Sequence, residues 1–215
     1  MSLMIHPWGR HHCRLPALKY AVAHSWPDAD GRIARVALGK NQSKVAGRPF
    51  HEIPNPQVLD AAKQFRDGFQ LMIEQPPFSG VLLPALHCAS IALELYLKSL
   101  SAREVEVPDT SFGEGAYIHA RSSVISHRLE DLFDRASPDI QQLIEKASGR
   151  FSRLSRFSGV RDALKAHNEM FMASRYPFEP GSELSGIRIE TLDELLQLLD
   201  DVIRKLPHRW VHDTL

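Results

Sequence analysis

The longest apolar stretch of the chain runs over residues 83–100, and its few polar side chains are spaced as on one face of an α-helix. These polar positions are His87, Ser90, Glu94 and Lys98. A helix with so narrow a polar stripe is typical of the inside of a bundle, where other helices surround it on several sides. The pattern therefore predicts a central helix from about Leu83 to Ala102, around which the other elements are arranged.

Amphipathic periodicity predicts further helices on both sides of this segment. The first begins at Asn55-Pro56, where asparagine caps the helix and proline fits its first turn, and it ends before Pro76. Four later helices are expected to begin at His127, Ser137, Ser158 (ending at Pro177) and Thr191. Thr191 and Glu194 have the spacing of a capping box. Five or six helices with short connections and few strand signals predict an all-α fold, an antiparallel helical bundle.

Residues 1–55 differ in pattern from the rest of the chain and are interpreted as a small N-terminal extension. Two short runs of mixed apolar character, at 19–26 and 32–38, flank the segment Pro27–Gly31, which is rich in turn-forming residues. Runs of this kind on both sides of a turn predict a β-hairpin in the extension.

The helical bundle is expected to occupy residues 56–215. Within it, residues 103–126 are predicted to be a long irregular insertion that holds a short strand at 104–107. The chain end is expected to be a frayed tail, because Pro207 interrupts the last helix shortly before His212. The sequence contains no internal repeat and no low-complexity segment.

The charged residues balance, since 26 Lys and Arg against 26 Asp and Glu give a net charge of zero and a sequence pI of about 7.2. Such a chain has no overall attraction for nucleic acid or for a membrane surface, so contact with either must rest on a local patch. Charged residues interrupt the segment at 83–100 before about 20 apolar residues accumulate, which argues against a membrane span. The N-terminal residues lack the apolar run of a signal peptide. We therefore expect a cytoplasmic protein that does not contact a membrane.

The cysteines and the N-terminal histidines bear on redox and metal chemistry. Two cysteines are too few for a disulfide framework, which suits a reducing cytoplasm. Cys88 lies in the apolar helix, where burial is expected to raise its thiol pKa and leave it inert. A cluster of metal-ligand types occurs near the N-terminus: His6, His11, His12 and Cys13. Adjacent residues rarely converge on one ion, so neither a metal ion nor another cofactor is expected.

Three short motifs recur in one known group of proteins. They are Ile91–Lys98 in the central helix, the His-x-Leu-x-x-Leu pattern of His127–Leu132, and Arg175-Tyr176-Pro177 at the end of a helix. In combination these motifs resemble the second helix, a short-helix start and a helix ending of the HEPN superfamily of helical-bundle proteins. The resemblance covers roughly residues 56–206 and leaves out the N-terminal extension and the insertion at 103–126.

The resemblance implies one of two kinds of function. Many HEPN proteins are metal-independent ribonucleases of toxin–antitoxin or phage-defence systems, and their active sites lie between the subunits of a homodimer. Others are non-catalytic modules that bind a partner protein or a nucleotide. The partners that the resemblance implies are therefore a second copy of the chain, RNA and an antitoxin-like protein.

Nuclease members of the superfamily carry an arginine, then four to six residues, then a histidine. Arg161 and His167 match this spacing late in the chain, with the polar residue Asp162 directly after the arginine. The resemblance therefore implies Arg161, Asp162 and His167 as catalytic residues. Arg121 and His127 match the spacing as well, but they lie in a predicted loop.

Cleavage of RNA without a metal ion needs a base for the 2′-OH proton and a cation for the charge on the phosphorane. A histidine that titrates near neutrality supplies the first, and an arginine supplies the second. A structural role is the alternative, because five intervening residues place Arg161 and His167 about 120° apart around a helix. His167 is also in line with the apolar Leu164 and Phe171. His127 is interpreted first as a residue that bonds backbone amides at a helix start.

One segment of the chain is locally basic. Arg150, Arg153 and Arg156 precede Arg161 and alternate with phenylalanines. Arginines can hold phosphates and an exposed phenylalanine can stack on a base, so these three arginines are candidates for RNA binding. The alternative is a solvated face of a helix with the phenylalanines in the core.

Overall fold

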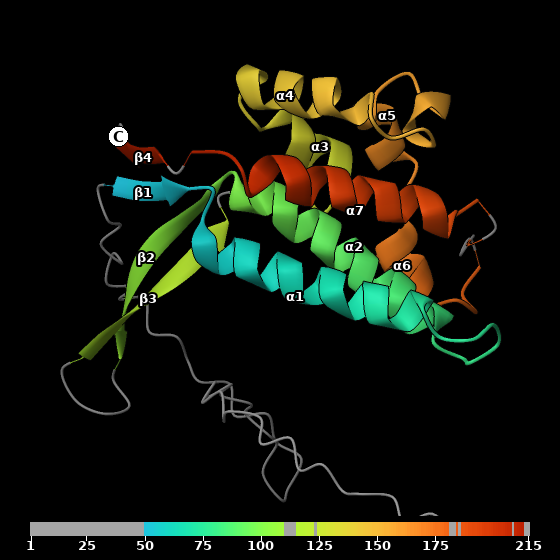
Figure 1. Ribbon diagram of the computed structural model, residues 1–215. Helices are drawn as coiled ribbons and strands as arrows, with labels where there is room; N and C mark the ends of the chain where they lie inside the picture. The colour runs from blue at the N-terminus through green and yellow to red at the C-terminus, as the bar shows by residue number, and fades with distance from the viewer. Residues whose placement is uncertain are drawn as a thin grey trace, which may run out of the picture. The chain divides into compact units, whose positions relative to one another are not determined.

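The computed structural model describes residues 50–109, 115–122, 124–180, 184, 186–207 and 209–212. They belong to the second of two compact units of the chain, Ser43–Leu215; the first unit, with the predicted β-hairpin, lies outside the described residues. The described part is mostly helical, as predicted (Figure 1). Its elements in chain order are β1 (Phe50–Ile53), α1 (Pro56–Ile73), α2 (Leu82–Ser99), β2 (Ala102–Asp109), β3 (Gly115–Ser122), α3 (Leu129–Asp134), α4 (Pro138–Ser148), the 3₁₀ turn η1 (Leu154–Arg156), α5 (Val160–Lys165), α6 (Met170–Arg175), α7 (Ile189–Ile203) and β4 (Arg209–His212).

Helix α2 is the central helix that the apolar pattern predicts. It contacts α1, α3, α6 and α7, and Figure 1 shows it running beside α1 and α7. Side chains that recur at every fourth position, such as Ala89, Leu93 and Leu97, are completely or almost completely buried. The helix ends at Ser99 rather than near residue 102, because the chain enters strand β2 at Ala102.

The predicted start of α1 is confirmed. The Asn55 side chain accepts a hydrogen bond from the backbone N–H of Val58 at 3.2 Å, and Pro56 occupies the first helical position. Asn55 is fully buried, and its own backbone N–H donates to the carbonyl of Ser99 at 2.8 Å. The cap therefore joins the start of α1 to the end of α2.

The single helix predicted from Ser158 to Pro177 is wrong, because the chain forms α5 and α6 with a turn between them. In this turn the backbone N–H groups of His167 and Asn168 bond carbonyls three residues earlier, which tightens and ends α5. The side chain of Asn168 accepts the backbone N–H of Leu129 at 2.8 Å. Asn168 thus caps α3 from outside, and this distant contact fixes the turn.

The capping box predicted at Thr191 is also wrong. Helix α7 begins two residues earlier, at Ile189, which leaves Thr191 inside the helix and buried. The Glu194 carboxylate accepts the backbone N–H of Arg153 at 2.8 Å instead of a backbone group of its own helix. A tertiary contact has therefore replaced the local one.

Two small antiparallel sheets accompany the helices in the described part of the chain. Strands β2 and β3 form a hairpin with Ala102 opposite Ser122, and β2 contains the strand predicted at 104–107. Strand β4 pairs with β1, with Arg209 opposite Ile53. The prediction of a frayed tail is therefore wrong for β4, because its backbone is paired with a strand that precedes α1.

A buried carboxylate connects three helices. Asp200 of α7 is 8% exposed and accepts hydrogen bonds from the Tyr96 hydroxyl of α2 at 2.8 Å and from Arg66 Nη1 of α1 at 2.6 Å. Burial, followed by the hydrogen bond to Asp200, raises the pKa of Tyr96, so the hydroxyl stays protonated and able to donate. A buried charge is tolerated only with such partners, so the network fixes how α1, α2 and α7 sit against one another.

Replacing Asp200 with alanine is expected to lower the free energy of unfolding by about 3–5 kcal/mol, because Arg66 and Tyr96 lose a buried partner. Tyr96→Phe removes one hydrogen bond and is expected to cost about 1–2 kcal/mol. The matched control is Asp201→Ala, whose ion pairs lie at the surface and are worth at most about 1 kcal/mol. Urea denaturation followed by circular dichroism measures all three. Equal losses for Asp200→Ala and Asp201→Ala would contradict the role given to the network.

Candidate functional site

The structure places His167 in the core. His167 is 3% exposed, and its ring Nδ1 lies 2.7 Å from the carbonyl oxygen of Ala163, to which an Nδ1–H can donate. Burial lowers the pKa of His167, and the hydrogen bond to Ala163 offsets this only in part. The ring is therefore a neutral, hydrogen-bonded core residue, as in the structural alternative above.

Arg161 and Asp162, by contrast, lie at the surface of α5. Arg161 donates from Nε and Nη2 to the carboxylate of Asp134, at 2.9 and 2.8 Å, which is a two-pronged ion pair. Asp162 accepts the hydroxyl of Ser158. A pocket of about 370 Å³ is lined by Arg161 and Asp134 but not by His167. The geometry thus separates the environments of the two residues that the spacing suggests as a catalytic pair.

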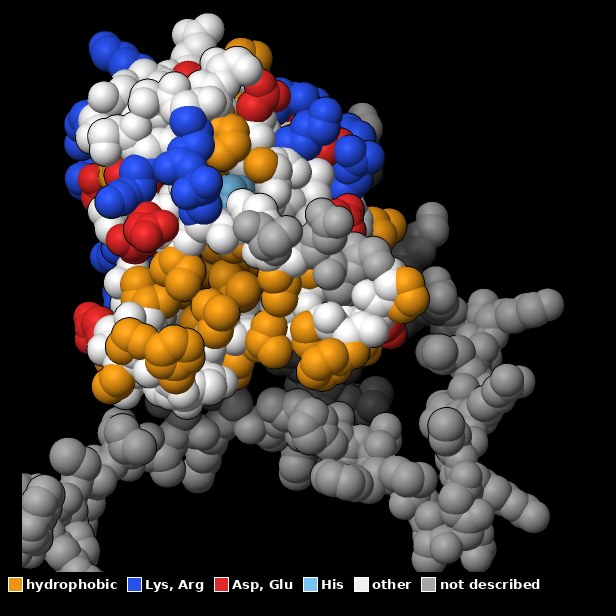
Figure 2. Space-filling model, turned by 90° about the vertical axis from the view of Figure 1, so that its right-hand side faces the viewer, with side chains coloured by type: hydrophobic (Ala, Val, Ile, Leu, Met, Phe, Trp, Pro, Cys, Tyr) orange, Lys and Arg blue, Asp and Glu red, His pale blue; other side chains and the backbone are white. Residues whose placement is uncertain are grey.

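The three candidate RNA-binding arginines are exposed, and one of them, Arg150, lies beside an acidic residue. Arg150 lies 3.6 Å from Asp201, and its guanidinium is 5.8 Å from the centre of the Phe151 ring. Arg156 donates to the backbone carbonyl of Arg153 at 3.0 Å. Phe151 and Phe157 pack against the core instead of standing free for a base. Figure 2 shows Lys and Arg side chains over the upper part of one face, interspersed with Asp and Glu.

A cluster of ionisable groups lies on the polar stripe of α2. Glu94 Oε1 accepts Lys98 Nζ at 2.6 Å and lies 3.0 Å from Nδ1 of His127, which comes from the loop before α3. The side chains of Glu94 and Lys98 are 15% and 14% exposed, whereas that of His127 is 71% exposed. The carboxylate favours the tautomer with hydrogen on Nδ1, so Nε2 is left as an acceptor. The sequence suggested that His127 bonds backbone amides at a helix start. In the structure its ring bonds the Glu94 carboxylate instead.

A second cluster occupies the other end of the same stripe. His87 lies two helical turns before Glu94, with Nδ1 3.3 Å from Ser174 Oγ and its ring stacked on Phe171 at 5.1 Å. The Arg175 guanidinium lies 5.4 Å from the centre of the Phe171 ring and 5.2 Å from that of Tyr176. Burial, and then the charge of Arg175, lower the pKa of His87.

The fold thus brings the three motifs singled out in the sequence to one side of α2. Glu94 and Lys98 belong to the first motif, His127 to the second and Arg175 to the third. The sequence identifies the polar stripe but does not indicate which residues of other elements lie against it. The polar stripe itself could have indicated the site. Polar side chains of a buried helix need polar partners, and the other two motifs supply such partners.

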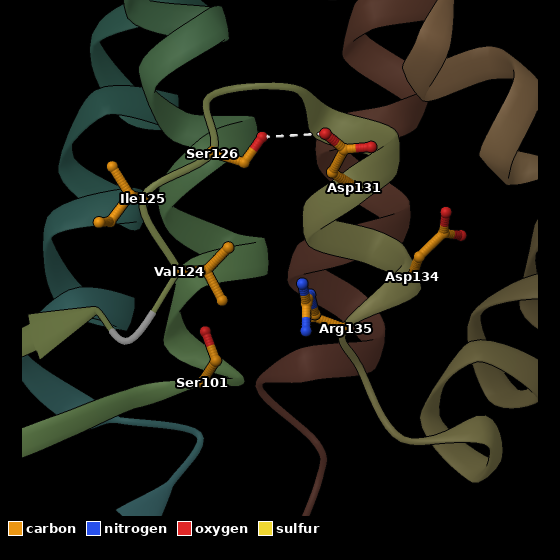
Figure 3. A pocket seen from close by; sticks show the side chains of 7 residues that line it. All are labelled: Ser101, Val124, Ile125, Ser126, Asp131, Asp134 and Arg135. Carbon is orange, nitrogen blue, oxygen red and sulfur yellow. Dashed lines mark hydrogen bonds between the residues drawn. The ribbon is translucent and has the colours of Figure 1, made fainter.

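The loop that carries His127 is held in place beside a pocket. The pocket measures about 740 Å³ and is lined by Ser101, Val124, Ile125, Ser126, Asp131, Asp134 and Arg135 (Figure 3). Ser126 donates to Asp131 at 3.1 Å and accepts the backbone N–H of Arg128 at 3.1 Å. In Figure 3 Arg135 extends into the space between this loop and α3, whereas Asp134 points away from Ser126. The hydrogen bonds of the Ser126 hydroxyl hold the backbone on both sides of His127 in place.

The remaining expectations from the sequence concern metal binding, membrane spans and Cys88. Among the described residues no three or more His, Cys, Asp or Glu side chains gather as a metal-binding group; the N-terminal cluster at His6–Cys13 lies outside them. A search of the described helices finds none with both the length and the apolar character that crossing a membrane requires. Burial raises the pKa of Cys88, as expected.

Comparison with protein-family models, curated proteins and solved structures found no match.

Acid is expected to destabilise the protein through His167. Its pKa in the folded state lies below the ordinary 6.5, so as the pH falls the unfolded chain binds the proton first. The contribution of the neutral His167 ring to the free energy of unfolding is complete above pH 6.5. Below pH 6.5 this contribution falls by up to roughly 1.4 kcal/mol per pH unit. Unfolding free energies between about pH 5 and pH 7.5 test this.

His167→Gln is expected to lower overall stability but to flatten this pH dependence, leaving the part that arises from His87. The control is Leu164→Ala, which lowers stability by truncating a fully buried side chain but removes no titratable group, so the slope should stay as in the wild type. An identical slope in the wild type and in His167→Gln would contradict the core role assigned to His167.

Proposed function

We propose that the protein is an HEPN-like, RNA-binding protein that cleaves RNA without a metal ion, and that Glu94, Lys98 and His127 carry the reaction in place of Arg161 and His167. One observation carries the proposal: a single oxygen of Glu94 bonds both Lys98 and an imidazole whose other nitrogen is open to solvent. Such a carboxylate–imidazole pair orients a histidine as a general base.

In the proposed reaction His127 Nε2 takes the proton of a ribose 2′-OH. The resulting oxygen attacks the adjacent phosphorus, the bond to the 5′-oxygen of the next nucleotide breaks, and a 2′,3′-cyclic phosphate forms. The departing oxygen takes a proton from water and becomes a 5′-OH, and His127 returns its proton to the solvent. Glu94 is a positioning residue that holds the imidazole through Nδ1 and stabilises its positive charge after proton transfer. The requirement for a 2′-OH restricts the reaction to RNA.

Lys98 is the cation of this arrangement. Its Nζ uses one of its three donors on Glu94 and lies within hydrogen-bond reach of the same oxygen as His127 Nδ1. This position suits a cation that stabilises the negative charge on the phosphorane. Arg150, Arg153 and Arg156 are exposed and supply contacts to phosphates along the strand, so RNA binding should weaken as salt rises.

A second function is a non-catalytic helical module that binds a partner protein, such as an antitoxin-like protein, or a nucleotide. The burial of His167 and the ion pair of Arg161 with Asp134 favour it, because neither residue is then available for catalysis. In this case the bond between Glu94 and His127 only fastens the loop before α3 to α2. Cleavage of RNA in the absence of metal separates the two functions.

Purified protein is expected to cleave single-stranded RNA in the presence of EDTA, to leave 2′,3′-cyclic phosphate ends, and to leave DNA of the same sequence intact. His127→Ala is expected to slow cleavage by about 100-fold to 10,000-fold, because the general base is lost. Glu94→Gln should also lower the rate, because an amide no longer fixes the hydrogen of the His127 ring on Nδ1.

His119→Ala and Arg161→Ala are the controls, because both residues are exposed and lie outside the proposed site. Both variants should cleave RNA at the wild-type rate. Loss of cleavage in Arg161→Ala with full activity in His127→Ala would show that Arg161 and His167, the pair identified by sequence spacing, carry the reaction instead. A folded wild-type protein that binds RNA and never cleaves it would favour the non-catalytic module.

A further inference from the structure

Two arginines stand opposite each other where the β2–β3 hairpin joins the bundle. Arg103 of β2 is the register partner of Arg121 of β3, and both are exposed. Directly opposite residues of an antiparallel pair point to the same face, with Cβ atoms about 4.5–5.5 Å apart. Like charges at this separation destabilise a hairpin, and an anion that contacts both removes this cost. The hairpin belongs to the insertion that the family resemblance leaves out, so the resemblance assigns it no role.

Both arginines line a pocket of about 310 Å³, together with Val105, Ser122 and Ile125. Ile125 also lines the larger pocket of about 740 Å³, so the two pockets meet at this side chain. In the larger pocket, Arg135 extends into the space between the loop and α3 (Figure 3). Three guanidinium groups therefore line two adjoining pockets. We call this surface the arginine groove and define it by Arg103, Arg121, Ile125 and Arg135.

The two acidic residues of the larger pocket already have partners. Asp134 accepts hydrogen bonds from Nε and Nη2 of Arg161 at 2.9 and 2.8 Å, and in Figure 3 it points away from Ser126. Asp131 accepts the Ser126 hydroxyl at 3.1 Å. Both carboxylates are thus occupied by residues outside the arginine groove.

Arg121 and Arg135 are the accessible cations of the groove. Within the described part of the chain neither side chain makes an ion pair or a hydrogen bond, whereas Arg103 has a further contact. Both are exposed. A guanidinium presents its N–H donors in a planar fork that matches the oxygens of a phosphate. Two such forks in adjoining pockets suit an anion with more than one phosphate, such as a strand of nucleic acid.

We infer that the arginine groove holds the phosphates of the RNA strand beside the nucleotide at His127, with Arg121 and Arg135 as the phosphate contacts. Ile125 lies two residues before His127, and two residues of backbone span at most roughly 7 Å. A strand bound at His127 therefore reaches the groove within its neighbouring nucleotides. Ile125 is 89% exposed and offers an apolar contact to a ribose or a base. The inference rests on the proposed function for the identity of its ligand.

Binding of a single-stranded 2′-O-methyl RNA, measured by fluorescence anisotropy at several salt concentrations, tests the groove. This RNA has no free 2′-OH, so the measurement does not depend on cleavage. Arg121→Gln and Arg135→Gln should each weaken binding by about tenfold at low salt and lower the slope of log Kd against log salt by about 0.7, because each removes one phosphate contact. Arg121→Lys should keep the slope, since the charge remains, and should lose affinity only through the missing fork.

The matched control is Arg188→Gln, which should bind this RNA like the wild type. Arg188 is exposed and precedes α7, and Figure 1 shows the start of α7 at the end of the bundle away from the hairpin. A photo-crosslinking phenylalanine analogue at position 125 should join to the RNA, whereas the same analogue in place of Leu71, which is 65% exposed on α1, should not. A wild type that does not bind the RNA, or equal losses in Arg188→Gln and Arg121→Gln, would overturn the inference.

Cleavage kinetics separate this inference from the proposed reaction. Arg121→Gln should raise KM for RNA and leave kcat within about twofold, because a contact to a phosphate that does not react stabilises substrate and transition state equally. A loss confined to kcat would overturn the inference. A protein that binds RNA through Arg121 and Arg135 but never cleaves it would contradict the proposed reaction and support the groove.

Discussion

The fold depends on a charged carboxylate that is buried where three helices meet. Asp200 is stabilised there by hydrogen bonds from Tyr96 and Arg66, so the packing of α1, α2 and α7 must bring these three side chains together. Successive residues of a helix are about 100° apart, so Tyr96 facing α7 directs Glu94 and Lys98 to the opposite side of α2. The buried network thereby decides which polar side chains of α2 face α3 and α6, and it determines where the candidate site lies.

Much of this helical architecture could be predicted, because its signals are local. The apolar run of α2, the cap at Asn55 and the apolar face of α3 need only neighbouring residues to be recognised. The division between α5 and α6 could not be predicted, because it depends on Asn168 bonding Leu129 of another helix. The pairing of β4 with β1 was missed for the same reason: each strand is four residues long, and in the sequence all of the helices lie between the two strands.

The candidate site shows the same limit. The spacing of Arg161 and His167 is visible in the sequence, but the carbonyl of Ala163 and the carboxylate of Asp134, which occupy these side chains, are not. Conversely, Glu94 and Lys98 were visible as part of the polar stripe, while the histidine that shares the Glu94 carboxylate lies 33 residues further along. Spacing along a chain identifies residue types suited to a reaction, and tertiary packing decides which of them remain accessible to a substrate.

The proposed reaction requires that Glu94 orient the ring of His127 and leave Nε2 of that ring open to a substrate. Two-dimensional ¹H–¹⁵N spectra of the histidine rings, recorded at a pH where they are neutral, test it directly. The account predicts that wild-type His127 carries its hydrogen on Nδ1, and that Glu94→Gln returns it to the mixture in which Nε2–H predominates, as in free histidine. An Nε2–H ring at His127 in both proteins would contradict the claim.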